Sequence, residues 1–420
     1  MARSDVAETA DREAFGAATH ERSVPRISIA AFCAADTLAV MQRAAADRRL
    51  SKANVAIHPG GIGEAASFFA QNQTPDLLVV ETSSEGGAVL AELEQLASVC
   101  DEKTKVVVIG HANDVQLYRE LARRGISEYL VAPLSPLQLI EAISGLYANP
   151  NAPPVGRIAV FTGARGGAGA STIAHNVGWY IAEGLSINTA IVDFDLPFGT
   201  AALNFNQDPP QGAIDALIAP ERLDDVLLDR LLAKCGDHLS LLAAPALLER
   251  EYELDASAFD SVLNQVRASM PAVIVDLPRA WTAWSRQILY MADEIVIVAT
   301  PDLASLRNTR NMLESIQSKR TNDSPPKIVV NQTAIAKRPE IPLKEFGETI
   351  GQEPVLVLPF DAPLFGTAAN NGQMLAQVQP NSRAAEGMRA LAEMITGRTI
   401  SQASKNGALS FLPFLNRKAG

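Results

Sequence analysis

The sequence has little of what secreted and membrane-spanning proteins carry. It holds three cysteines, Cys33, Cys100 and Cys235, which lie far apart and show no metal-binding spacing. They are too few for a disulfide framework and indicate a reducing compartment. No run of about 18 apolar residues is present, so no membrane-spanning helix is expected. The first residues lack the apolar core of a signal peptide, and we expect a cytoplasmic protein.

Positive charge is also scarce. There are 36 lysines and arginines against 47 acidic residues, which gives a formal net charge of −11. This balance argues against binding to nucleic acid driven by overall charge, and we expect no specific nucleic-acid partner. Hydrophobic residues make up 47% of the chain, as in ordinary globular proteins. A length of 420 residues exceeds what one hydrophobic core usually organises and favours two domains.

One segment marks the domain boundary. Residues 148–156 read ANPNAPPVG, and these prolines and small polar residues indicate a linker. Residues 1–25 are polar, and we expect them to be disordered. The sequence thus predicts a first domain at 26–147, a second at 157–398 and a C-terminal tail at 399–420.

The first domain alternates short apolar runs with segments of helical spacing, such as 37–49 and 114–125. This alternation predicts five β–α units and a small doubly wound, flavodoxin-like sheet. The expected strands are 27–32, 54–59, 76–81, 105–110 and 127–133.

The second domain repeats the alternation on a larger scale. Its apolar runs are nearly continuous in Val, Ile and Leu, which is typical of parallel strands buried on both faces. The fold class is therefore α/β, with a second, mostly parallel sheet. The expected strands are 157–162, 188–194, 239–245, 272–278, 294–300, 327–332 and 354–360.

A glycine-rich loop, GARGGAGAST, follows the first strand of this domain at 163–172. Strand, glycine-rich turn and helix in this order predict a phosphate-binding loop, because glycines let backbone N–H groups approach an anion. Ser171 stands where such a loop places the hydroxyl that binds Mg²⁺, and Thr172 follows it. Ala170 stands where the loop lysine is expected. The alternative is the strand–helix turn of a dinucleotide-binding fold.

Acidic residues end the strands that follow. Asp193 and Asp195 end one strand, and Asp276 ends another. A carboxylate at such a strand end reaches the metal of a phosphate-loop protein, and a second one orients the attacking water. We expect Ser171 and Asp276 to bind Mg²⁺, with Asp193 as a further candidate ligand, and Asp195 to orient water.

Together these segments resemble the ParA/MinD ATPases, whose deviant Walker A loop is written KGGxGK[ST][ST]. The resemblance covers about residues 155–398 and places Arg165 at the signature lysine. It implies that ATP binds through the loop, that Asn331 in VVNQ recognises adenine and that Pro359 in LPFD passes the base. The nucleotide-binding loop residues are Gly166, Gly167, Ala168, Gly169, Ala170, Ser171 and Thr172.

Within that superfamily, the alanine-bearing loop, AHN (174–176), FD-PFGT (194–200) and TPDLASLRN (300–308) resemble the CpaE, or TadZ, proteins. This resemblance implies a nucleotide-gated homodimer that positions assembly of Flp/Tad type IV pili at the cell pole or at foci near the inner membrane. Its partners would be pilus-machine proteins and a polar or focal landmark. The family joins a receiver-like domain to the ATPase domain, in the order found here.

The absent lysine weakens the expected chemistry. In a phosphate loop it neutralises charge on the β- and γ-phosphates, and without it hydrolysis should slow. The resemblance implies that Arg165 contacts the partner's phosphates across a dimer, where a guanidinium binds two oxygens at once. The sequence leaves ATP hydrolysis open.

The first domain resembles a response-regulator receiver that has lost its phosphorylation residues. The phosphoacceptor position holds Glu81, the switch hydroxyl is replaced by Gly110, and the final lysine by Ala132. We expect an interaction domain without phosphorelay. Glu81 is interpreted either as a permanently charged imitation of the acceptor or, as the favoured alternative, as a solvated strand-end residue.

More than one interpretation stays open for His175, for the tail and for the chain as a whole. His175 approaches the nucleotide or, as we favour, packs the helix or lies at the surface. The tail SFLPFLNRKAG (410–420) contacts a membrane surface, docks on its own domain or binds a pilus-machine protein. For the whole chain, the competing functions are a DNA-partitioning ATPase and a non-catalytic scaffold with a relict nucleotide site.

Overall fold

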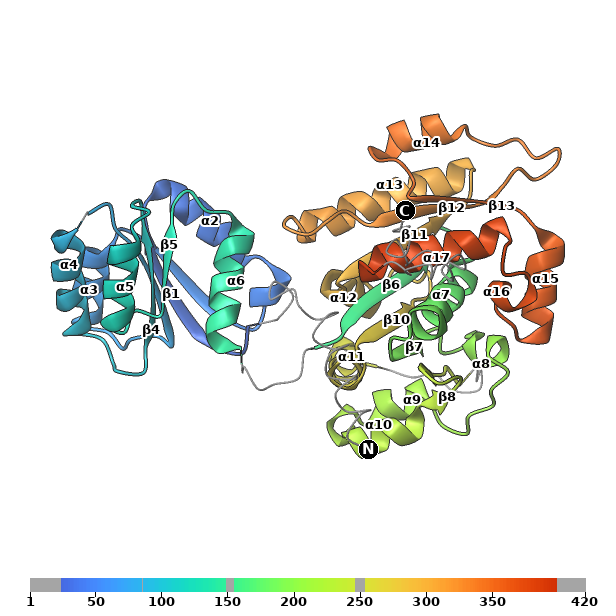
Figure 1. Cartoon of the computed structure of the whole chain (residues 1–420), viewed down its shortest axis with the longest axis horizontal. Helices are drawn as coiled ribbons and strands as arrows, with labels where there is room; N and C mark the ends of the chain where they lie inside the picture. The colour runs from blue at the N-terminus through green and yellow to red at the C-terminus, as the bar shows by residue number, and fades with distance from the viewer. Residues whose placement is uncertain (1–23, 85, 149–154, 246–253, 399–420) are drawn as a thin grey trace, which may run out of the picture.

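The computed structural model describes residues 24–84, 86–148, 155–245 and 254–398. They form two α/β domains, each built around its own sheet, as the sequence predicts (Figure 1). Most of the predicted N-terminal segment and the whole predicted C-terminal tail lie outside the described residues. Val24 already belongs to the first domain, since its side chain is buried and its N–H donates to Arg49 O at 2.8 Å.

The N-terminal domain is a five-stranded parallel sheet in the order β2-β1-β3-β4-β5. Helices α2 and α6 cover one face, and α3, α4 and α5 cover the other. Its elements are β1 (Ser28–Cys33), α2 (Ala35–Ala45), η2 (Arg48–Leu50), β2 (Asn54–Pro59), α3 (Ile62–Phe69), β3 (Leu77–Glu81), α4 (Gly87–Ala97), β4 (Lys105–Gly110), α5 (Val115–Arg123), β5 (Glu128–Val131) and α6 (Pro136–Tyr147).

The C-terminal domain has an eight-stranded sheet in the order β13-β12-β11-β6-β10-β7-β9-β8. Only the short edge strand β8, which the sequence analysis missed, is antiparallel among the described strands. The strands are β6 (Arg157–Gly163), β7 (Thr189–Asp193), β8 (Ala233–Lys234), β9 (Leu239–Leu242), β10 (Ala272–Asp276), β11 (Glu294–Ala299), β12 (Lys327–Thr333) and β13 (Leu356–Pro359).

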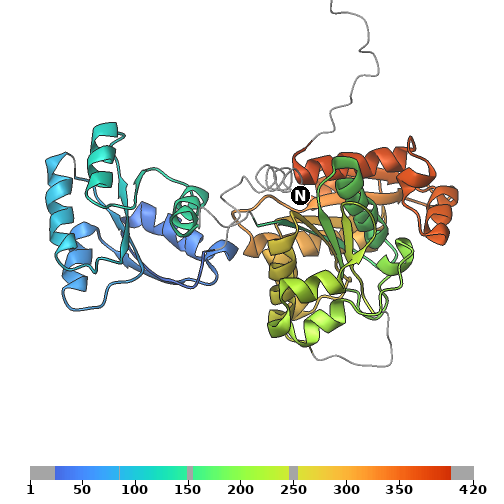
Figure 2. The same cartoon turned by 60° about the horizontal axis from the view of Figure 1, so that its bottom comes forward.

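Two helical layers enclose this sheet (Figure 2). One core joins it to α9 through α13 and to α14, and the other joins it to α7, η3 and α15 through α17. The helices are α7 (Ala170–Trp179), η3 (Tyr180–Gly184), α8 (Ala201–Asn204), α9 (Ala213–Ile218), η4 (Pro220–Arg222), α10 (Asp225–Leu231), α11 (Ala256–Ser269), α12 (Ala283–Met291), α13 (Leu303–Lys319), α14 (Leu343–Ile350), α15 (Ala362–Asn371), α16 (Leu375–Val378) and α17 (Arg383–Thr396).

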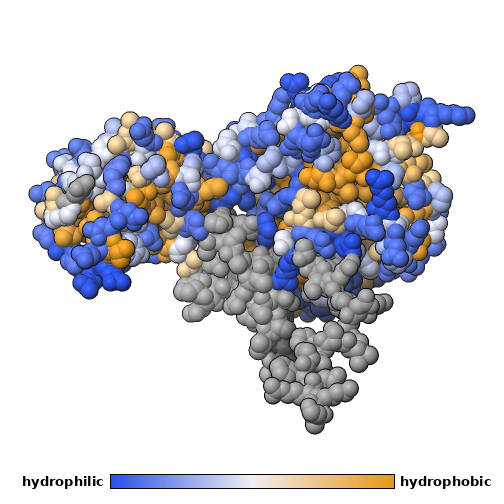
Figure 3. Space-filling model, turned by 45° about the horizontal axis from the view of Figure 1, so that its top comes forward, coloured by the Kyte–Doolittle hydropathy of each residue, from blue (hydrophilic) through white to orange (hydrophobic). Residues whose placement is uncertain are grey.

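Burial explains why the middle strands read as continuous apolar runs. Every residue of β7 and β10 is buried, because helices cover both faces. The carboxyl ends of parallel strands meet at one edge, so side chains that follow them are brought together. Within the described residues, no helix is both long and apolar enough to span a bilayer. Apolar surface collects on the C-terminal domain in the space-filling view (Figure 3).

Candidate functional site

The glycine-rich loop joins β6 to α7 in the strand–turn–helix arrangement that the sequence predicts. Gly167 and Gly169 have φ angles of +74° and +91°, in the left-handed region that other residues rarely adopt. A Cβ built on Gly166 or Gly167 would meet no other atom within 4 Å. Ala170 begins α7, whose free N–H groups point toward the loop. The loop therefore forms an open backbone cradle suited to phosphate.

The metal-site candidates come together at the carboxyl edge of the sheet. Ser171 Oγ donates to Asp276 Oδ1 at 3.1 Å. Asp276 and Asp193 end adjacent strands in matching register, and both carboxylates are buried. A hydroxyl and a carboxylate in contact at the start of a helix are the donor set that Mg²⁺ takes beside bound phosphates. These residues fit a magnesium ion accompanying a nucleotide.

Asp193 holds the segment that carries Asp195. Its Oδ1 accepts from Asp195 N at 3.0 Å, and its Oδ2 accepts from Ala201 N at 3.1 Å. Burial, and then the charge of Asp276, raise the pKa of Asp193 to about 7. Two facing carboxylates in a dry site repel each other, and a cation between them and a phosphate would relieve that repulsion. Asp193 thus both shapes the segment and makes the site attract cations.

Asp195 lies half-buried beside a large apolar cavity. Its carboxylate accepts from Phe198 N at 3.3 Å, and burial raises its pKa. The cavity has a volume of about 680 Å³ and is lined by aromatic residues, among them Phe259 and Trp284, whose rings stack at 4.3 Å. Phe198, at the cavity rim, is 69% exposed. The predicted water-orienting residue therefore stands at an open mouth.

Arg165 is engaged within its own chain. Its Nη1 donates to Asp302 Oδ2 at 3.1 Å, and Asp302 caps α13 by accepting from Ser305 N. The guanidinium is half-exposed, since its side chain keeps 49% of its accessible surface. To contact the phosphates of a second copy, as expected from the sequence, Arg165 must exchange this partner.

The predicted adenine-binding residue supports the loop. Asn331 is buried, and its Nδ2 donates to Ala168 O at 2.9 Å. Gln332, at a φ of +55°, donates from Nε2 to Gly167 O at 2.8 Å. Pro359 ends β13 opposite Thr333 on β12, two residues beyond Asn331. Asn331 therefore lies beside the phosphate cradle, two amides hold the cradle's backbone carbonyls, and Pro359 lies on the neighbouring strand.

His175 lies next to the candidate metal site, although the sequence analysis favoured a packing or surface role for it. It is fully buried, with Nε2 3.2 Å from Asp276 Oδ2 and Nδ1 2.8 Å from Asn204 Nδ2. It packs in the helix, as expected, but it also contacts the metal-site carboxylate. The signal was spacing, because Ser171 and His175 are four residues apart and share one face of α7.

Arg279 is a second residue that the sequence analysis missed. It follows β10 by three residues and lines both the apolar cavity and a smaller one that reaches Ala164 at the start of the loop. Its side chain is exposed, and no ion pair to it occurs among the described residues. It is a cation at the mouth of the site, and its place directly after a strand end was the available signal.

Glu81 is not the solvated residue that the sequence analysis favours. Its side chain is 6% exposed; Oε2 accepts from Ala34 N at 2.7 Å, and Oε1 lies 3.1 Å from His111 Nε2. At Gly110, a Cβ would meet the Tyr129 hydroxyl, which donates to Ala112 O. The carboxylate at the position of a receiver's phosphoaspartate is thus satisfied by internal hydrogen bonds, although it borders a cavity of about 530 Å³.

Comparisons with known proteins follow the two domains. No family model matches the chain. It is 50% identical to the pilus assembly protein CpaE of Caulobacter crescentus, covering 30% of this chain and 98% of that one, at a TM-score of 0.30. It is 26% identical to a ParA family ATPase of Chlorobium tepidum, covering 57% and 98% of the two chains at a TM-score of 0.51. The septum site-determining protein MinD of Synechocystis is 25% identical over 221 residues, which are 52% of this chain and 78% of that protein.

Proposed function

The chain belongs to the ParA/MinD ATPase superfamily as a CpaE-like member, and from this premise we propose that it organises pilus assembly as an ATP-gated dimer. Mg·ATP binds at the loop 163–172, and binding joins two copies through the carboxyl edge of the large sheet. The dimer positions the Flp/Tad pilus machine at a pole or focus. Hydrolysis is slow or absent, because Ala170 carries no charge.

The observation that carries the proposal is the contact between Ser171 and Asp276 beneath an open glycine cradle. A relict loop has no reason to keep a hydroxyl, two facing carboxylates and a left-handed glycine turn together. Backbone N–H groups, the helix dipole and Mg²⁺ supply binding energy that does not need the lysine. When bound, Mg²⁺ would neutralise phosphate charge, and Ser171 and Asp276 would hold it.

Two arginines support the dimeric part of the proposal. Arg165 and Arg279 both lie at the mouth of the site, one tied to Asp302 and the other without an ion-pair partner among the described residues. Guanidinium groups bind phosphate oxygens in pairs. In a dimer that sandwiches ATP, these cations would replace the charge missing at position 170.

A non-catalytic scaffold is the second candidate function. The amides of Asn331 and Gln332 donate to loop carbonyls and so brace the loop from within the chain. A loop that is already braced keeps its shape when its ligand is lost. In that case the C-terminal domain would act through its surface alone.

The deciding experiment titrates a fluorescent ATP analogue with and without Mg²⁺ while light scattering reports molecular mass. We expect saturable, Mg²⁺-dependent binding together with a shift from monomer to dimer. Asp276→Asn should abolish the Mg²⁺ dependence, whereas the matched control Asp229→Asn, at an exposed position of α10, should not. Absence of binding at millimolar nucleotide would leave the scaffold as the function.

A further inference from the structure

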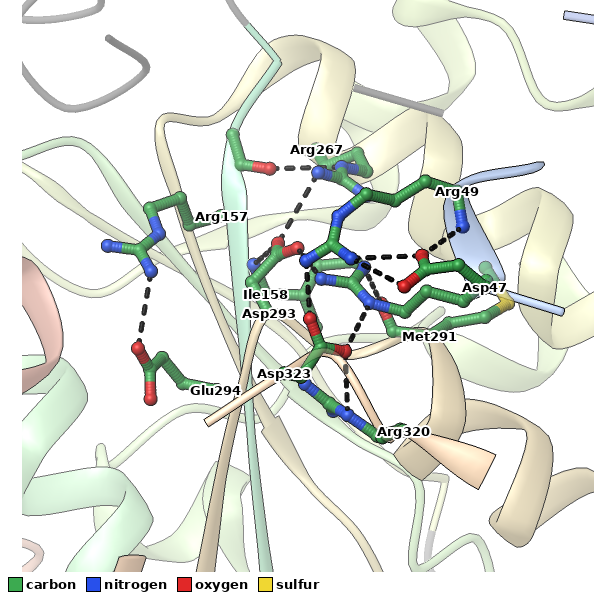
Figure 4. A network of polar contacts seen from close by, with 12 residues as sticks. Asp47, Arg49, Arg157, Ile158, Arg267, Met291, Asp293, Glu294, Arg320 and Asp323 are labelled. Atoms are coloured by element: carbon green, nitrogen blue, oxygen red, sulfur yellow. Dashed lines mark hydrogen bonds and ion pairs between the residues drawn. The ribbon is translucent and has the colours of Figure 1, made fainter. Parts of the chain in front are cut away.

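The two domains meet through buried charges at the amino-terminal edge of the large sheet (Figure 4). We call this set the charge cluster. It comprises Asp47, Arg48 and Arg49 around η2 of the N-terminal domain, with Arg267, Asp293, Arg320 and Asp323 of the C-terminal domain.

The guanidinium of Arg48 directs its hydrogen bonds into the C-terminal domain. Its Nη1 donates to Met291 O at 2.9 Å, its Nη2 lies 3.2 Å from Asp293 Oδ1, and its Nε donates to Asp323 Oδ2 at 3.0 Å. One guanidinium therefore reaches the end of α12, the start of β11 and the loop after α13. A planar fork with fixed donors fits this arrangement, and a lysine would not.

Arg49 also binds the carboxylate of Asp323, and a residue of its own domain orients it. Asp47 binds its Nη1 through both oxygens at 2.9 Å, and Arg49 Nη2 donates to Asp323 Oδ1. Asn322 returns the contact, since its Nδ2 donates to Asp47 Oδ2 at 2.9 Å. Because the arginine is ordered within its own domain, less side-chain entropy is lost when the domains join.

Burial makes the arrangement specific. The side chains of Arg48, Asp293 and Asp323 keep 11%, 0% and 6% of their accessible surface. Buried charges are tolerated only where their partners are in place, and removing one partner leaves the others uncompensated. A domain that slid or swung on its neighbour would expose these groups singly. The cluster therefore favours one orientation of the two domains.

The cluster lies far from the candidate nucleotide site. Asp293 Oδ2 accepts from Ile158 N at 2.8 Å, at the amino end of β6, and the glycine-rich loop follows the other end. Five residues of strand separate Ile158 from Gly163, or about 17 Å at 3.3 Å per residue. Helices α3, α4 and α5 cover the face of the N-terminal domain that points away from the contact (Figure 1).

We propose that the charge cluster is a docking lock that fixes the N-terminal domain on the amino-terminal edge of the large sheet, so that the two domains act as one rigid unit. The lock leaves the carboxyl edge uncovered for the nucleotide and a second copy. It also leaves the α3–α4–α5 layer facing away from the C-terminal domain. The lock does not depend on the proposed function, because none of its contacts involves a residue of the candidate nucleotide site.

The test measures the distance between the domains in the full chain without nucleotide. Nitroxide labels at Gln95→Cys on α4 and Glu314→Cys on α13, both exposed positions, report it by pulsed electron paramagnetic resonance. Cys100 and Cys235 are replaced by serine. The parent should give one narrow distance distribution. Arg48→Glu/Arg49→Glu should broaden it at least twofold, because like charges then face Asp293 and Asp323.

The matched control is Arg119→Glu/Arg123→Glu, an equal charge reversal on the exposed face of α5. It should keep the narrow distribution. The milder pair Arg48→Ala/Arg49→Ala covers the case in which charge reversal prevents folding. A broad distribution in the parent, or a narrow one in the alanine pair, would overturn the lock. Either result leaves the nucleotide-binding proposal untouched, since that proposal is read from ATP titration.

Discussion

Two corners of this molecule occupy equivalent places in two parallel sheets, but they hold their acidic side chains in different surroundings. Both lie at the carboxyl edge, and each has an acidic residue at a strand end. In the N-terminal domain Glu81 is satisfied by Ala34 N and His111. In the C-terminal domain Asp193 and Asp276 face each other, and burial, together with the charge of Asp276, raises the pKa of Asp193.

The two corners differ in how many buried carboxylates they bring together. At the first, which we call the closed corner, the buried carboxylate of Glu81 is satisfied within the chain, although the corner borders a cavity of about 530 Å³. At the second, which we call the open corner, Asp193 and Asp276 repel each other, and the uncharged Ala170 supplies no cation to offset that repulsion. Hydrogen bonds are present at both corners, so the difference lies in the repulsion between two buried carboxylates, which a bound cation would relieve.

The largest effect should come from removing the charge at the open corner. We expect Asp276→Asn to weaken Mg²⁺-dependent nucleotide binding by about 10- to 100-fold, the usual range for loss of a group that organises a metal site. Glu81→Gln, the same change at the closed corner, should leave the affinity unaltered. Equilibrium titration of both variants against the parent measures this. Equal weakening in both would mean that the corners are not distinct.

The second effect would come from supplying the missing cation. Ala170→Lys places an ammonium at the start of α7, where a charged hydrogen bond to phosphate is worth about 1.5–3 kcal/mol. We therefore expect affinity for ATP to rise about tenfold or more, and turnover to become measurable. Ala170→Met adds similar length without charge and should do neither. If Ala170→Met raises the affinity for ATP as much as Ala170→Lys does, side-chain packing rather than charge limits nucleotide binding.

The sequence predicted this contrast only in part. Strand ends at Asp193 and Asp276 follow from apolar runs, and parallel topology brings them together, so the Ser171–Asp276 contact was within reach of sequence reasoning. The burial of Glu81 was not, because it depends on Ala34 and His111, which lie 47 and 30 residues away. The docking lock was further out of reach still. Arg48 contacts Met291, which lies 243 residues away in the sequence, and the sequence analysis only placed Arg48 and Arg49 in the helical segment 37–49.

The third effect concerns the stability of the closed corner. Glu81→Ala leaves the Ala34 N–H and His111 without their acceptor, and an unsatisfied buried group costs about 1–3 kcal/mol. We expect the Ala34 amide to exchange its hydrogen faster by a corresponding factor of roughly 5 to 160. Glu102→Ala, at an exposed position, is the control. Unchanged protection of Ala34 would show that the carboxylate is not what closes the corner.

The smallest effect should appear at the docking lock as acid is added. Burial works to raise the pKa of Asp323, but the guanidinium groups of Arg48, Arg320 and Arg49 outweigh it and hold the pKa below the ordinary 3.8. A carboxyl with a lowered folded pKa stabilises the native state fully above 3.8, and that contribution is lost as pH falls through the lowered value.

The inter-domain distance distribution should therefore stay narrow from pH 7 to about pH 4 and broaden below it. Asp323→Asn cannot titrate, so its distribution should be broader at pH 7 and change less with acid than that of the parent. If the parent broadens near neutral pH instead, a group other than Asp323 controls the contact. In that event the arginines would not hold the controlling group in its charged form, and the docking lock would resemble the open corner, where buried charges repel each other, rather than the closed one.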